Sequence, residues 1–217
     1  MQMSTQLIIE RNYHKLCFLK MEIPIFPLNG AVLFPTTSLP LNIFENRYIE
    51  MVNYSLSRDR LIGMIQNDEN NKLFKIGCLG KIHSFNETSD GRYLISLHGT
   101  YRFKVVKEFN NSFNFRTIEA KILKESNENN LLNDNHKKQI LEKYKEYTKF
   151  KNINLGIEEI EKIEIEQIIK FIAMVSPFKD IEKQALLETN NFIDFYNKLL
   201  SIIELEIFDN FQSNVIN

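Results

Sequence analysis

The apolar residues of this chain change their spacing near residue 125, and that change limits the folds open to it. Before it, residues 22–124 show short segments in which apolar and polar side chains alternate, as they do in β-strands. After it, residues 136–210 carry apolar side chains at the three- and four-residue spacing of amphipathic helices. Residues 125–135 are polar, as in a linker. The chain is therefore predicted to be α+β, with a β-rich part followed by a helical bundle.

The β-rich part opens with extended segments marked by proline, residues 23–28, 31–35 and 39–41. Because proline has no N–H, residues 23–28 are expected at a sheet edge or bulge. Such an edge is a candidate for binding a peptide as an added strand. A helical period then predicts one embedded helix over residues 44–56, from the stripe of Phe44, Tyr48, Met51 and Val52.

Alternating patterns return after this helix and predict five further strands. Asp90-Gly91 supplies a turn between two of them, and Gly77 and Gly80 indicate a bulge or a close backbone approach. Several short strands of this kind favour a small closed or half-closed barrel. The predicted strands are residues 61–66, 74–85, 92–98, 101–105 and 115–123.

The second half is predicted to hold three or four helices. Ser176 and Pro177 are typical of a helix start, with Ser as the cap and Pro in the first turn, and Asn191 is expected to cap the last helix. The predicted buried positions are Ile140, Leu141, Tyr144, Tyr147, Ile157, Ile160, Ile163, Ile165, Ile168, Ile169, Ile172, Ile181, Ala185, Leu186, Phe192, Phe195, Leu199, Ile202 and Ile203.

The ends and the cysteines bear on location. Residues 1–21 lack a clean period and are expected to form a loosely ordered extension. No apolar run approaches the roughly 20 residues needed to span a bilayer, and no signal-peptide core is present. Cys17 and Cys78 are isolated and suit a reducing compartment. We therefore expect a cytoplasmic protein.

Three blocks of the sequence together carry a resemblance to a known family. The blocks are Ile25-Phe26-Pro27-Leu28 with Val32-Leu33-Phe34-Pro35 and Leu39-Pro40-Leu41-Asn42-Ile43-Phe44-Glu45-Asn46-Arg47-Tyr48; Asp90-Gly91-Arg92-Tyr93 with Gly99-Thr100-Tyr101-Arg102-Phe103; and Glu182-Lys183-Gln184-Ala185-Leu186-Leu187-Glu188. In order and in spacing, they closely resemble the N-terminal, substrate-binding domain of Lon proteases. The sequence departs from the family at Thr36, where the family commonly has Gly, at Asn46, where it commonly has Pro, and near Phe195, where it commonly has Arg.

The resemblance implies a PUA-like pseudo-barrel followed by a helical bundle, and a non-catalytic module that engages unfolded or partner proteins. The chain ends where the ATPase of Lon would begin, so we expect a stand-alone member without ATPase and peptidase domains. A cellular protease is an expected partner, a homodimer is compatible with the sequence, and no cofactor is expected. The motif positions that are candidates for binding are Phe34, Phe44, Glu45, Arg47, Tyr48, Arg92 and Arg102.

The same residues also have structural interpretations. Phe34, Phe44 and Tyr48 are expected mainly in the core, and Glu45 is expected to pair with Arg47 or Arg102. A catalytic role for these charges is the weaker hypothesis. A metal site is not expected, because pairing of residues 82 and 95 would separate His83 from His98 by ~13 Å.

The sequence leaves two other functions open. An RNA-binding PUA-like module is one alternative, but the formal net charge of −1 argues against it. A small-molecule enzyme is the other, although no phosphate-binding loop or nucleophile motif occurs among the seven glycines. Binding to a membrane is not expected either.

Overall fold

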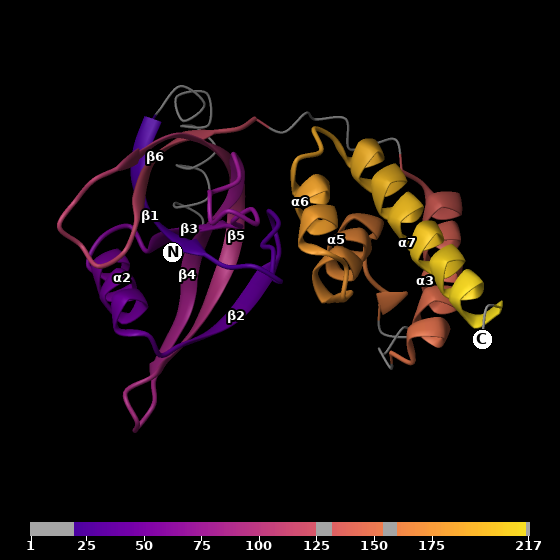
Figure 1. The fold of residues 1–217 in the computed structure, drawn as a ribbon, viewed down its shortest axis with the longest axis horizontal. Helices are drawn as coiled ribbons and strands as arrows, with labels where there is room; N and C mark the ends of the chain where they lie inside the picture. Colours follow the sequence, from indigo (N-terminus) through magenta and orange to yellow (C-terminus); the bar gives the residue numbers. More distant parts are fainter. Residues whose placement is uncertain (1–19, 125–131, 154–159, 216–217) are drawn as a thin grey trace, which may run out of the picture. The chain divides into compact units, whose positions relative to one another are not determined.

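The computed structural model describes residues 20–124, 132–153 and 160–215, and it divides into two compact units (Figure 1). One unit is β-rich and ends at Lys124, and the other is helical and begins at Glu125. Of the extension predicted over residues 1–21, residues 1–19 with Cys17 lie outside the described residues, as do most of the predicted linker and Ile157. Lys20 and Met21, which were expected in that extension, belong to the first strand of the sheet. In the described residues no helix is long and apolar enough to cross a membrane.

Over residues 20–124, the β-rich unit contains one helix and a single mixed sheet. The sheet order is β2-β5-β4-β3-β1-β6, and β5 also pairs with β6, so β1, β3, β4, β5 and β6 close into a barrel. This confirms the barrel expected from the alternating segments. The elements are β1 (Lys20–Pro27), β2 (Ser38–Ile43), α2 (Asn46–Leu56), β3 (Leu61–Ile65), β4 (Ile76–Glu87), β5 (Tyr93–Phe109) and β6 (Thr117–Ile122).

Strand β1 is not an edge, so the prediction that residues 23–28 offer a free edge was wrong. It pairs with β6 antiparallel through Pro24 and with β3 in parallel from Ile25 to Pro27. The two neighbours take successive halves of β1, and Pro24 and Pro27 lie at the ends of these ladders. Each proline therefore falls where a missing N–H interrupts the sheet least.

Two predicted strands proved to be one. Residues 93–109 form the single strand β5, which continues through Gly99. Its pairing with β4 shifts register between Leu79 and Gly80, next to Gly99. Such an irregularity bends a strand without ending it, so β5 pairs with β2 in its first half and with β6 in its second half.

The interior of the barrel is filled by one aromatic ring. Phe103 is fully buried among aliphatic side chains of β1 and β6, including Ile23 and Ile118. A side chain at Gly77 would overlap the Phe103 ring and would also lie 2.6 Å from the carbonyl oxygen of Met64. The close approach expected at Gly77 is thus confirmed, and it makes room for the ring.

The helical unit contains α3 (Asp134–Lys151), α5 (Ile165–Val175), α6 (Asp180–Leu187) and α7 (Phe192–Val215). Most of the predicted apolar stripes are buried, among them Tyr144 and Tyr147 on α3 and Leu199 on α7. Asn191 caps α7 as expected, since its Oδ1 accepts from the backbone N–H of Asp194 at 2.8 Å.

The predicted helix start at Ser176-Pro177 was wrong. Ser176 instead follows the last residue of α5, and its hydroxyl lies 3.3 Å from that of the buried Tyr144. Helix α6 begins at Asp180, where Glu182 accepts from the N–H of Lys179 at 2.8 Å. Because the helix starts later than expected, Ile181 is 60% exposed and not buried.

Candidate protein-binding surface

Exposed apolar side chains gather at one end of the barrel sheet, where β2, β4 and β5 meet. Phe44, which follows β2, is 64% exposed, and Leu94 and Phe85 are 43% and 41% exposed. Ile43 lies opposite Tyr93, and Tyr93 lies opposite Glu87, so the ends of the three strands are adjacent. Figure 1 shows the connection from β2 to α2 passing the base of the projecting β4–β5 hairpin.

We call Phe44, Phe85, Tyr93 and Leu94 the hairpin surface. The rings of Phe85 and Tyr93 meet edge to face, with centroids 4.9 Å apart. Strand alternation places Leu94 on the opposite face of the hairpin, between Asn42 and Asn86. Apolar side chains are therefore offered on both faces of a strand pair that extends past the core. Exposed clusters of this kind mark sites of protein interaction.

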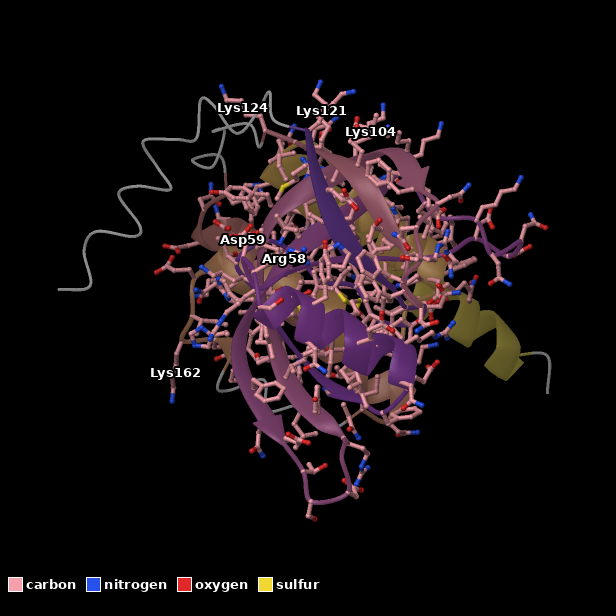
Figure 2. All side chains as sticks on the ribbon, turned by 90° about the vertical axis from the view of Figure 1, so that its left-hand side faces the viewer. Arg58, Asp59, Lys104, Lys121, Lys124 and Lys162 are labelled. Carbon is pink, nitrogen blue, oxygen red and sulfur yellow. The ribbon has the colours of Figure 1, made fainter. Side chains whose placement is uncertain are left out.

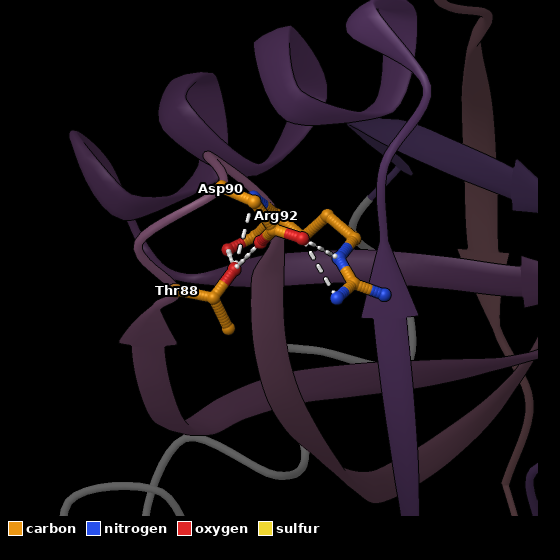
Figure 3. A network of polar contacts seen from close by, with 3 residues as sticks. All are labelled: Thr88, Asp90 and Arg92. Atoms are coloured by element: carbon orange, nitrogen blue, oxygen red, sulfur yellow. Dashed lines mark hydrogen bonds and ion pairs between the residues drawn. The ribbon is translucent and has the colours of Figure 1, made fainter.

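The tip of the hairpin is held by a polar network (Figure 3). Arg92 pairs with Asp90 through Nη2 at 2.7 Å and Nε at 2.8 Å, and the Thr88 hydroxyl donates to the Asp90 carboxylate. The hydrogen bond from Arg92 lowers the pKa of Asp90 to about 2. Asp90 is therefore charged at neutral pH. Gly91, at φ 80°, completes the turn predicted for this position.

The base of the hairpin surface rests on the start of α2. Glu45 and Arg47 form the expected ion pair at 2.7 Å, and the Arg47 guanidinium lies 4.6 Å from the centroid of the Tyr48 ring. Tyr48 packs edge to face on Phe26 of β1 with centroids 4.4 Å apart. Burial raises the pKa of Tyr48, so it stays a neutral phenol. These contacts anchor the segment that carries Phe44.

The predicted binding residues separate into two groups. Phe34 and Arg102 are buried, at 1% and 6% exposure, and support the fold from inside. The other five candidates lie near the end of the sheet that carries the hairpin. Four of them are exposed and Tyr48 is half-buried; the exposed ones are Phe44, Glu45, Arg47 and Arg92. The expectation that Phe44 lies in the core was wrong, because α2 begins only at Asn46 and leaves Phe44 outside its buried stripe.

Phe85 and Leu94 were missed as surface residues. Phe85 continues the alternating pattern of its strand, and alternation alone does not reveal where a strand leaves the core. Leu94 interrupts the pattern, because it falls on the polar face with Arg92 and Ser96. The available signal was local, since Phe85 is followed by a polar stretch that reaches Arg92. That stretch is longer than a two-residue hairpin turn and indicates strands that project.

Two features of the described residues concern metal and small-molecule binding. Ile82 pairs with Leu97 and not with Ile95 as assumed, and the ladder is irregular at His83. Among residues whose positions are described, no three His, Cys, Asp or Glu side chains are placed to hold a metal. A pocket between Tyr54, Arg58 and Leu61 and the start of β1 has a volume of about 140 Å³. Ligand pockets for small molecules are commonly about 300–1,000 Å³.

The sequence and the fold both match proteins of one kind. The family model of the ATP-dependent protease La (LON) substrate-binding domain matches residues 22–204. Lon protease of Buchnera aphidicola subsp. Baizongia pistaciae is 27% identical over 202 residues, which cover 86% of this chain and 25% of that protein. Lon protease 1 of Bacillus subtilis is 24% identical over 207 residues, which cover 87% of this chain and 26% of that protein. The chain thus spans about a quarter of the length of these relatives.

Two solved structures share the fold. The N-terminal domain of Mycobacterium avium complex Lon protease superposes with a TM-score of 0.66 at 13% identity, covering 85% of this chain and 98% of that one. The Lon N-terminal domain protein from Xanthomonas campestris superposes with a TM-score of 0.60 at 20% identity, covering 85% of this chain and 98% of that one.

The family departures also have structural explanations. Thr36 adopts φ 68°, a left-handed conformation that glycine takes without strain, and its N–H still donates to Gly99 at 2.9 Å. Asn46 is the first residue of α2, a position that suits proline. Both substitutions leave the local geometry in place. By its sequence over residues 22–204 and by its fold, the chain belongs to the LON substrate-binding domain family.

Proposed function

We propose that this chain is a non-catalytic module that binds unfolded or partly folded proteins through the hairpin surface. The observation that carries the proposal is the exposure of Phe44, Phe85 and Leu94 at one end of a closed, well-packed barrel. Unfolded chains offer apolar side chains that a folded protein hides, and burying one aromatic ring contributes about 1.5–3 kcal/mol. The family name, substrate-binding domain, agrees with such a role.

The proposal extends to the setting in which the module works. Its relatives are Lon proteases, and the match covers their N-terminal part and not their ATPase or peptidase parts. A role in protein quality control follows, in which bound proteins are passed to a cellular protease in the cytoplasm. The nearly neutral overall charge and the apolar character of the hairpin surface support a protein client over RNA.

A titration tests this function. A small disulfide-bonded protein is labelled and offered in two forms, native and unfolded by reduction and carbamidomethylation, which adds no charge. We expect saturable binding of the unfolded form, measured by fluorescence anisotropy, and at least tenfold weaker binding of the native form. Equal binding of both forms, or binding of neither, would remove the support for a module that recognises unfolded chains.

A further inference from the structure

Three lysines lie directly opposite one another on the outer face of the barrel. Lys20 of β1 pairs in register with Lys121 of β6, and Lys121 pairs in register with Lys104 of β5. Directly opposed residues point to the same face, and neighbouring strands are about 4.8 Å apart. The three lysines therefore form a row across three strands, in the half of β5 that lies farther from Tyr93. We call Lys20, Lys104 and Lys121 the lysine row.

The next rung of the same ladder holds the nearest carboxylates. Glu22, Glu119 and Lys107 lie opposite one another there. Glu119 is bound by Lys20 at 2.8 Å and lies 3.8 Å from Lys107, and the hydrogen bond from Lys20 lowers its pKa. This carboxylate is thus shared by two lysines of the face.

Lys104 and Lys121 are left with their charge directed to solvent. Both are exposed, and within the described parts of the chain neither has an ion-pair partner. Figure 2 shows them with the exposed Lys124 at the same end of the molecule. Three arginines of this unit, Arg47, Arg92 and Arg116, each pair with a carboxylate. Lys104 and Lys121 are directly opposed. Like charges in this arrangement are destabilising unless an anion neutralises them.

We infer that the lysine row binds acidic segments of client polypeptides, which deepens the proposed function and rests on it. Carboxylates spaced along an extended chain can meet ammonium groups that project from successive strands. Charge complementarity of this kind raises association rates and selects among partners more than it raises affinity. The row would thus favour acidic clients, while the hairpin surface holds their apolar side chains.

A nucleic acid fits this face less well. Single-stranded nucleic acids need aromatic side chains on which successive bases stack. Beyond the lysine row, the face continues with Glu22 and Glu119, which repel phosphates, and then with Phe109, over which Lys107 lies at 4.7 Å.

Two synthetic peptides test the inference with the full chain. They share length and apolar residues, but one carries four Glu where the other carries four Gln. At low salt we expect the wild-type chain to bind the Glu peptide about tenfold more tightly. The K104E/K121E variant should lose this preference and keep its affinity for the Gln peptide. Adding salt to 0.15 M should weaken the preference, because the screening length falls to about 8 Å.

The K162E/K198E variant is the matched control. It changes two exposed lysines of the helical unit by the same total charge, so it should keep the preference. Circular dichroism should show K104E/K121E folded, because both positions are exposed to solvent. Equal binding of both peptides by the wild type overturns the inference alone, whereas failure to bind either peptide overturns the proposed function as well.

Two further outcomes would count against an acidic polypeptide. A loss of preference in K162E/K198E as large as in K104E/K121E would assign the effect to overall charge. A single-stranded oligonucleotide of equal charge that binds more tightly than the Glu peptide, and does so through Lys104 and Lys121, would make the row a nucleic-acid site.

Discussion

Replacing Phe103 with alanine is expected to lower the free energy of unfolding of the β-rich unit by about 3–5 kcal/mol. The ring is fully buried among side chains of β1 and β6, and the backbone at Gly77 is shaped around it. Alanine would leave a cavity that these strands cannot close, because β1 is fixed between β3 and β6. The loss is a large part of the 5–15 kcal/mol that stabilises a typical domain.

Urea unfolding followed by circular dichroism measures this effect, since the chain has no Trp for fluorescence. Val106→Ala is the matched control, because Val106 lies on the same strand and is 43% exposed. Its change should stay within about 0.5 kcal/mol. A Phe103→Ala midpoint equal to that of the control would contradict the account of a barrel packed around this ring.

The double variant Phe44→Ser, Phe85→Ser is expected to weaken binding of an unfolded protein by about 30-fold or more, which corresponds to about 2 kcal/mol. Both rings are exposed in the free chain, so their loss removes contact area from the complex and little from the core. The thermal midpoint should therefore change by a few degrees at most. Anisotropy titration of the labelled unfolded protein measures the affinity.

The variant Leu205→Ser provides the comparison for this experiment. Leu205 lies on α7 of the helical unit and is 62% exposed, so it is as accessible as Phe44. If exposed apolar area alone determined binding, this variant would lose affinity too. Retained affinity in the double variant, or an equal loss in Leu205→Ser, would move the binding surface away from the hairpin.

The sequence was sufficient where a side chain's environment follows from its own strand or helix. The helical period, for example, correctly predicted that Tyr144 and Tyr147 are buried. The Asp90-Gly91 turn and the Asn191 cap depend on neighbouring residues alone, and they too could be predicted.

It was insufficient where a distant partner determines the outcome. The sequence around Pro24 contains no sign that β6 pairs with this segment, so the local pattern predicts a sheet edge there. Gly99 was read as a strand end because the neighbouring β4, which continues the sheet past it, is not visible in the local pattern. The lysine row depends on the register of three strands in the same way.

The candidate surface shows the same division. Motif resemblance singled out Phe44, Arg47 and Arg92, and the structure gathers them near one end of the sheet. Resemblance could not separate these exposed positions from Phe34 and Arg102, because buried and surface residues are combined in one motif. Whether a side chain is exposed depends on how the strands pack in the closed barrel, so it can be determined only from the three-dimensional structure.

Hydrogen exchange of the full chain, with and without an unfolded protein at saturating concentration, tests the central claim most directly. The account predicts slower exchange of amides in residues 43–48 and 85–94, which carry the hairpin surface and its base, with little change in α3 and α7. Slower exchange confined to the helical unit, or no change at residues 43–48 and 85–94 under saturation, would contradict it.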